Sequence, residues 1–194
     1  MKITSKITLA LAMMLGIGIG SSYAQTATAP ATMEIQTALA IVLETGSTID
    51  FGNVSATTPG AVFLDPKGLA NVSTGATTDV AQFNVTGGAA AGITVTYDAT
   101  VAMTATSGSA LTAGVGSTAA ILTLTPSVVG AQLVGGQSTA AAIGIGPAGT
   151  VTLAPVGDAN AGKYFIWVGG TIPTLANQAT GEYAGTFNIA VAYN

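Results

Sequence analysis

The sequence contains neither cysteine nor histidine. Without cysteine no disulfide can form, so sheet packing and core burial must stabilise the folded chain. The absence of both residue types also removes the usual nitrogen and sulfur ligands of zinc, and it removes the imidazole base of a Ser-His-Asp arrangement. The composition therefore favours a protein that is not an enzyme and that holds no metal or other cofactor.

Charged residues are also scarce, with four lysines or arginines against eight carboxylates. If the first 24 residues are removed, only Lys67 and Lys163 remain as cations, and the formal charge is 2 − 8 = −6. This charge excludes nucleic-acid binding, which requires cations to neutralise phosphates, and it disfavours an anionic membrane surface. A carboxylate pair assembled by folding, as in a glycosidase, remains an open alternative. The carboxylates stand singly at Glu34, Glu44, Asp50, Asp65, Asp79, Asp98, Asp158 and Glu182.

The N-terminal segment has the pattern of a secretory signal peptide. Lys2 and Lys6 precede an apolar run over residues 7–19, and Ser22-Tyr23-Ala24 supplies small residues before a cleavage point at Gln25. The run is short for a bilayer span. We therefore expect a signal peptide at 1–24, export of the chain, and no membrane insertion after cleavage. An N-terminal extension at 25–35 and a single domain at 36–194 would follow.

The remainder of the chain has the pattern of a β-rich protein. Short stretches of alternating apolar and polar residues are separated by turns rich in glycine, serine, asparagine and proline, and Asp65-Pro66-Lys67-Gly68 has the form of a tight turn. This spacing predicts an all-β, Ig-like Greek-key sandwich. The expected strands cover residues 47–54, 80–86, 93–106, 121–125, 131–134, 151–156 and 164–168, besides a long alternating stretch at 27–43 and a final strand after Gly181.

Two further sequence patterns each allow a functional interpretation and a purely structural one. Residues 144–149 match the glycine spacing of a dinucleotide-binding loop, but a strand-like stretch rather than a helix follows them, which favours an ordinary loop. A row of threonines could form an ice- or carbohydrate-binding surface, or it could simply be the solvated face of a strand. The row consists of Thr94, Thr96, Thr100, Thr104 and Thr106.

The last fourteen residues alternate most regularly. From Tyr183 to Tyr193 the odd positions are mainly aromatic or aliphatic, and the even positions are small or polar. Strict alternation of this kind predicts a strand with one buried face. By this parity Phe187 points inward and Asn188 outward, so Phe187→Asp should be damaging and Asn188→Asp almost silent.

This ending, with glycine fourteenth from the end and tyrosine next to last, resembles the C-terminal signature of chaperone–usher pilus subunits. The chain is also similar to a family of small, cysteine-free, exported bacterial domains of unknown function. The C-terminal residues 168–194 and three further segments carry that similarity: Asp50-Phe51-Gly52, Asp65-Pro66-x-Gly68 and residues 83–87.

The pilus resemblance implies a sandwich that lacks a strand, with a hydrophobic groove between its first and last strands. A periplasmic chaperone and an outer-membrane usher would be its partners, and a second copy would fill the groove with its own N-terminal extension, giving a homopolymer at the cell surface. The alternative is a monomeric secreted or outer-surface sandwich with a binding role. The implied groove residues are Gly181, Tyr183, Phe187, Ile189, Val191, Tyr193 and Asn194, and the implied donor residues are Ala27, Ala29, Ala31, Met33 and Ile35.

Overall fold

A computed structural model describes residues 36–56, 60–109, 121–173, 175 and 178–194. Residues Gln36–Asn194 belong to one compact unit. The expected signal peptide and the expected extension at 25–35 lie outside the described residues.

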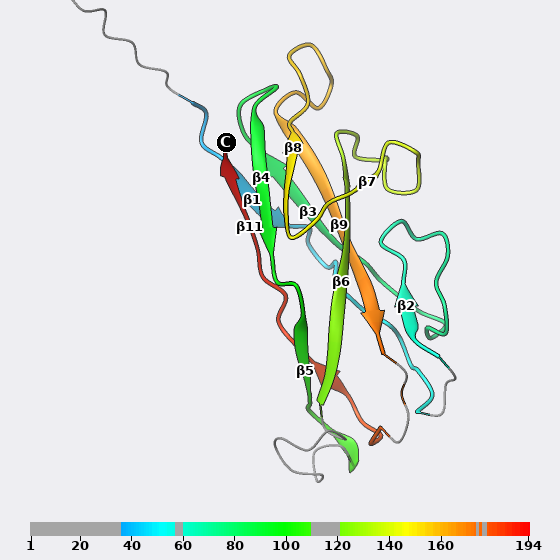
Figure 1. Ribbon diagram of the computed structural model, residues 1–194. Coiled ribbons are helices and arrows are strands. Elements are labelled where there is room, and N and C mark those ends of the chain that lie inside the picture. The colour runs from blue at the N-terminus through cyan, green and yellow to red at the C-terminus, as the bar shows by residue number, and fades with distance from the viewer. Residues whose placement is uncertain (1–35, 57–59, 110–120, 174, 176–177) are drawn as a thin grey trace, which may run out of the picture. The chain divides into compact units, whose positions relative to one another are not determined.

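Within these residues the chain is an all-β sandwich of two antiparallel sheets, which confirms the predicted fold class (Figure 1). The larger sheet has the order β1-β3-β9-β6-β5-β10, with β2 also paired to β9 and β7 to β6. Its strands are β1 (Ala40–Leu43), β2 (Val62–Leu64), β3 (Ala81–Thr86), β5 (Val101–Ala105), β6 (Ile121–Ala131), β7 (Ile143–Gly144), β9 (Lys163–Ile172) and β10 (Tyr183–Ala184). The smaller sheet has the order β11-β4-β8, with strands β4 (Gly92–Tyr97), β8 (Ala148–Thr152) and β11 (Ile189–Tyr193).

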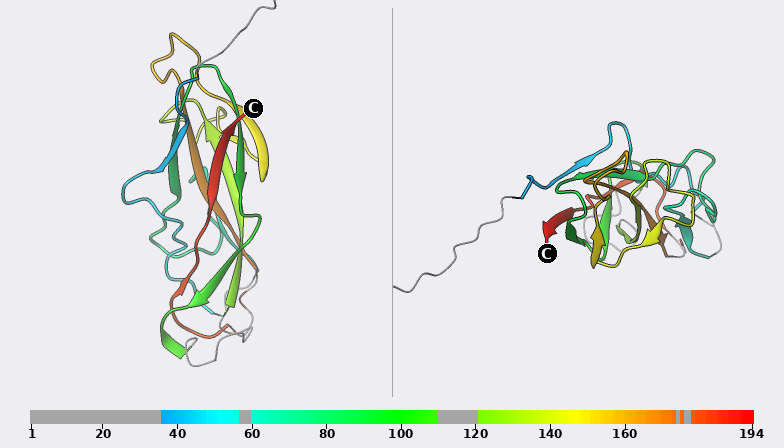
Figure 2. Two further views of the ribbon diagram at one scale, coloured as in Figure 1. Left: turned by 90° about the vertical axis from the view of Figure 1, so that its left-hand side faces the viewer. Right: turned by 90° about the horizontal axis from the view of Figure 1, so that it is seen from above.

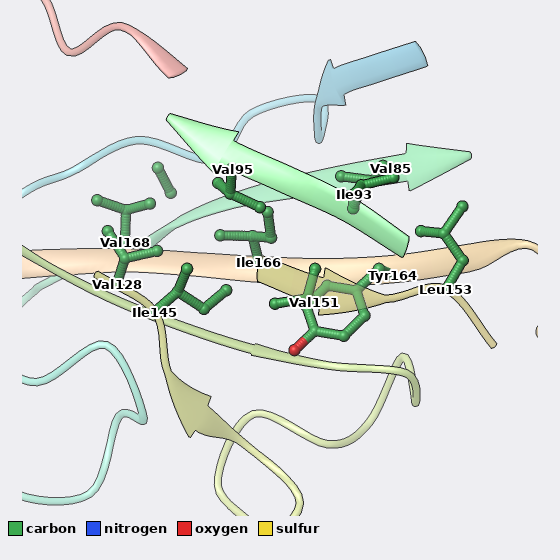
Figure 3. Close-up of a cluster of buried hydrophobic side chains, with 11 residues drawn as sticks. Val85, Ile93, Val95, Val128, Ile145, Val151, Leu153, Tyr164, Ile166 and Val168 are labelled. Carbon is green, nitrogen blue, oxygen red and sulfur yellow. The ribbon is translucent and has the colours of Figure 1, made fainter. Parts of the chain in front are cut away.

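A core of aliphatic side chains lies between the two sheets (Figure 3). Val85 on β3 and Ile166 on β9 face Ile93 and Val95 on β4, and all four are fully buried. They come from alternate positions of their strands, as the period-2 pattern requires. The opposite face of the larger sheet is covered by a smaller cluster around Trp167, whose indole N–H donates to Gln82 at 3.1 Å.

The C-terminal segment differs from the single strand that we expected. It forms two strands, because β10 pairs with β5 in the larger sheet and β11 pairs with β4 in the smaller one. The predicted strand at 93–106 is divided in the same way into β4 and β5. Alternation continues across both breaks, so the sequence pattern alone could not reveal that the chain changes sheets.

Other differences concern strand extent. Residues 47–54 make only an isolated bridge between Asp50 and Asp79. Residues 121–131 form one long strand, whereas we expected two separate strands at 121–125 and 131–134. The turn at Asp65 is confirmed, since the Gly68 N–H donates to the Asp65 carbonyl at 2.8 Å. Residues 144–149 end strand β7, turn over 145–147 and begin strand β8, so the helix that a dinucleotide-binding loop requires does not follow the glycine pattern. No helix among the described residues is long and apolar enough to cross a membrane.

Candidate functional site

The candidate site lies where the first and last strands of the fold approach each other. β1 ends the larger sheet and β11 ends the smaller one, so each is paired on one edge, to β3 and to β4 respectively. Their Cα atoms approach within 8 Å, and no backbone hydrogen bond joins them in the described chain. The left view of Figure 2 shows the C-terminal segment running up this side of the domain.

The hydrogen bonds between β11 and β4 show which backbone groups of β11 point toward its unpaired edge. The Asn188 carbonyl accepts from the Asp98 N–H at 3.2 Å, and the Asn194 N–H donates to the Gly92 carbonyl at 3.2 Å. Because hydrogen-bonded pairs alternate along an antiparallel ladder, the even residues of β11 bond to β4. The N–H and C=O groups of the odd residues Ile189, Val191 and Tyr193 therefore point away from β4, toward the open edge.

The same argument holds for β1. The Glu44 N–H donates to the Gln82 carbonyl at 2.8 Å, which places the even residues of β1 in the hydrogen-bonded pairs with β3. Ile41 and Leu43 consequently direct their backbone groups to the open edge. Among the residues that the structure describes, two strand edges thus remain unpaired along one side of the sandwich. Such edges are templates for pairing with a further strand.

Apolar side chains line this side of the molecule without being fully covered. Those of β11 pack against the main core but stay partly exposed, whereas their neighbours Ile93 and Val95 on β4 are 0% exposed. Leu43 has inward parity on β1 and is nevertheless 47% exposed. We call this surface the β1–β11 seam and define it as Leu39, Ile41, Phe83, Phe187, Ile189, Val191 and Tyr193.

Phe187 connects the seam to both halves of the interior. Its ring lies 6.2 Å from that of Phe83 and 5.8 Å from that of Tyr97, measured between centroids. The Tyr97 hydroxyl donates to the Ile145 carbonyl at 2.6 Å, and burial raises the pKa of this phenol above its usual value. Phe187 and Ile49 both pack against the main core and against a second cluster around Val62 and Leu124.

One end of the seam is closed by Tyr193. Its hydroxyl donates to the Thr37 carbonyl at 2.6 Å and accepts from the Gly88 N–H at 2.7 Å. We call these two hydrogen bonds the Tyr193 clasp. A Cβ at Gly87 would lie 2.7 Å from the Tyr193 hydroxyl and 2.9 Å from Leu39 Cδ1, so a larger residue there would have to displace these side chains. The seam is tightly packed at this end.

Asn188 lies where the C-terminal segment crosses between the sheets, and here one expectation is wrong. Its side chain points outward, but Nδ2 donates to Asp98 Oδ2 at 2.8 Å and the backbone N–H donates to the same oxygen at 3.0 Å. An aspartate at position 188 would face the Asp98 carboxylate directly. We therefore expect Asn188→Asp to destabilise the fold instead of being almost silent.

A cleft of about 470 Å³ lies at the other end of the seam. Ile49 belongs to its lining and also packs against the seam-side core, so the two features are continuous. Asp50 and Glu182 contribute carboxylates to its lining. Its apolar lining includes Val62, Met103, Leu122, Ile172 and Leu175.

The structure divides the residues that the sequence placed in one groove. Phe187, Ile189, Val191 and Tyr193 lie together on the seam. By contrast, Gly181 and Tyr183 line the cleft, where the Tyr183 hydroxyl donates to the Ala179 carbonyl at 2.7 Å. Asn194 follows β11, is exposed, and its Oδ1 accepts from the Thr94 hydroxyl. The candidate donor residues Ala27, Ala29, Ala31, Met33 and Ile35 lie outside the described residues.

The pilus resemblance implies a groove beside the first strand, but sequence reasoning identified no residue of that wall. Leu39 and Ile41 fall within the alternating stretch 27–43, and Phe83 falls within the expected strand 80–86. Their apolar parity was visible, but pairing between distant strands determines that they face β11. The threonine row is also divided, since Thr94 and Thr96 lie on β4 and Thr104 on β5, in different sheets.

Comparison with known families completes the description of the site. A family model described as a domain of unknown function, DUF4402, matches residues 41–193. The chain belongs to the DUF4402 family. The match to DUF4402 begins within β1 and ends with the last residue of β11, so it includes most of both strands of the seam. No curated protein matches the chain.

Proposed function

We propose that this DUF4402 protein is a structural, non-catalytic subunit of a bacterial surface filament assembled by donor-strand exchange. The observation that carries the proposal is the β1–β11 seam, where two unpaired strand edges flank half-exposed apolar side chains. A strand added there would gain main-chain hydrogen bonds to the free backbone groups and would bury every second side chain. The resemblance of the C-terminal residues to pilus subunits supports the same interpretation.

The occupant that we propose is the extension 25–35 of a second copy. From residue 27 onward, its odd residues are three alanines followed by Met33 and Ile35. Full burial of a methionine or isoleucine side chain stabilises an association by about 1.5–3 kcal/mol, and an alanine methyl contributes less. Most of the side-chain contribution would therefore come from the last two inserting residues, while the alanines would mainly permit close backbone pairing.

Strand insertion would require the seam to open. A strand paired to both β1 and β11 needs about 9–10 Å between them, which is twice the spacing of neighbouring strands. Their Cα atoms approach within 8 Å in the described state, and the Tyr193 clasp holds one end closed. A periplasmic chaperone would keep the seam open during export, and an usher would present it to the next copy. The protein would reach the cell surface through the periplasm.

A second candidate is a monomeric exported protein with a binding role, in which the chain's own extension folds back over the seam. The observation that favours it is the position of Thr37, which is bonded to Tyr193 beside the seam. The preceding residues are therefore attached close to the edge that they would cover. In that case the extension would run antiparallel to β1 and parallel to β11.

Comparison of the full chain with a variant lacking residues 25–35 tests the proposal. Both are exported with the native leader, and SDS-resistant ladders are examined on gently heated gels. We expect ladders from the full chain alone, and we expect them to return when the variant is mixed with full-length copies that can donate a strand. Ladders from the variant by itself, or a full chain that remains monomeric at high concentration, would contradict donor-strand exchange.

A further inference from the structure

We infer that the cleft at the open end of the seam is the receptor for Ile35 of a neighbouring copy, with Met33 of that copy packed against Phe187 beside the cleft. This inference rests on the proposed function and adds a direction, a register and a binding pocket to it. The partner is thus a peptide segment of the same chain that carries two large aliphatic side chains at alternate positions.

The two ends of the seam differ in the space that they offer. At one end, Gly87, Leu39 and the Tyr193 hydroxyl are so close that even an added methyl group would clash. At the other end, Ile49 leads into the cleft of about 470 Å³, whose lining combines polar residues such as Asp50 and Glu182 with apolar side chains such as Met103 and Leu122. Small side chains are therefore expected at the closed end and large ones at the cleft.

The donor segment has the matching gradient. Its inserting positions start with alanines at 27, 29 and 31 and end with Met33 and Ile35. If Ala27 lies opposite Tyr193 in an antiparallel pairing, Met33 lies opposite Phe187, because each stretch spans six residue steps, or roughly 20 Å. Ile35 then extends past Phe187 into the cleft.

This register also accounts for Pro30. The odd residues of β11 carry the free backbone groups, so they would bond to odd residues of the donor. Pro30 is even, and its missing N–H would face β1 instead of β11. The ladder between the donor and β11 would therefore lose no hydrogen bond.

The direction follows from the same arrangement. Residue 35 of the donating copy lies at the cleft of the accepting copy, and residue 37 of every copy lies at its own closed end, bonded to Tyr193. The closed end of one copy must then meet the cleft end of the next. A contact between two different surfaces repeats without closing and generates an open filament.

Engineered disulfides test this inference in the full-length chain, which has no native cysteine to interfere. One variant carries Ile35→Cys with Ile49→Cys, and a second carries Ile35→Cys with Met103→Cys, which places the second thiol on a different cleft residue. The matched control carries Ala27→Cys with Ile49→Cys. Polymers of the corresponding single variants show whether each substitution still permits folding and assembly.

We expect mild oxidation to form disulfides between neighbouring copies in both variants that carry Ile35→Cys. No disulfide between copies should form in the control variant. Intermolecular links through Ala27→Cys would show that the donor runs in the opposite direction, which overturns the inference while leaving strand exchange intact. Polymers that link at neither position would show that the cleft receives no donor residue. An Ala27→Cys link within single chains, without polymers, would show the fold-back arrangement and would overturn the proposed function as well.

Discussion

Asp98 Oδ2 accepts two hydrogen bonds from Asn188, one from the side-chain Nδ2 at 2.8 Å and one from the backbone N–H at 3.0 Å. The contact lies at the position where two neighbouring segments of the chain both change sheets. β4 leads into β5 on one side, and β10 leads into β11 on the other. The Asp98 carboxylate therefore joins the segment between β4 and β5 to the segment between β10 and β11.

Asn188→Asp tests the importance of this contact. We expect the free energy of unfolding to fall by about 1–2 kcal/mol, because a donor is lost and two carboxylates face each other in a partly exposed place. Denaturant unfolding at neutral pH measures the loss. The double variant Asp98→Asn with Asn188→Asp exchanges the donor and acceptor roles of the side chains and should restore most of it. Equal stability of the single variant and the parent chain would contradict the pairing.

Tyr193→Phe removes the clasp and keeps the ring. The loss of two hydrogen bonds should lower the free energy of unfolding by about 1–2 kcal/mol. It should also speed the uptake of a donor strand, because the seam opens more easily at its closed end. Tyr97→Phe is the matched control, since its hydroxyl also donates to a backbone carbonyl, that of Ile145, and Tyr97 belongs neither to the seam nor to the cleft lining. Polymerisation at the parental rate in Tyr193→Phe would show that the clasp does not limit insertion.

Parity along β11 gives a third prediction. Ile189→Asp would place a carboxylate against the apolar seam, and we expect it to cost about 2 kcal/mol or more and to abolish polymerisation. The adjacent Ala190→Asp adds the same charge on the outer face, where Ala190 is exposed. It should leave both stability and polymer yield nearly unchanged. A similar loss in both variants would mean that the seam is not an apolar binding surface.

Tyr164 gives a prediction about alkaline pH. Burial raises the pKa of its phenol from the usual 10.0 to about 12. Because the unfolded chain ionises first, the contribution of the neutral phenol is complete below pH 10 and is lost as the pH rises from about 10 to about 12. The free energy of unfolding should therefore fall through this window, and Tyr164→Phe should reduce the slope. An unchanged slope in that variant would place the pH dependence elsewhere.

The fold class could be predicted from the sequence, because apolar and polar residues alternate along the chain and the same positions alternate between buried and exposed in the strands. It also placed Phe187, Ile189, Val191 and Tyr193 on one face, and the structure keeps them on one surface. Tyr183 shares their parity yet lies at the cleft, since the chain changes sheets between β10 and β11. Alternation with a period of two predicts which face of a strand a residue occupies, but it does not predict the sheet to which the strand belongs.

The residues that form the opposite wall of the seam could not be identified from the sequence for a related reason. Leu39 and Ile41 lie far from β11 in sequence, and their position depends on the pairing of β1 with β3. The Asp98–Asn188 contact joins residues ninety positions apart, so it had no local signal either. Pairing between distant strands determines both the β1 wall and the Asp98–Asn188 contact, and a single sequence does not show which distant strands pair.

Backbone hydrogen exchange along β11 tests the central claim most directly. Ala190 and Ala192 bond to β4, so their amides should exchange slowly in the free subunit and in the polymer. The amides of Ile189, Val191 and Tyr193 point to the open edge and should exchange fast in the free subunit. We predict that these three amides become protected when the polymer forms. Odd-numbered amides that stay unprotected in the polymer, or that are already protected in a monomer, would contradict strand addition by a second copy.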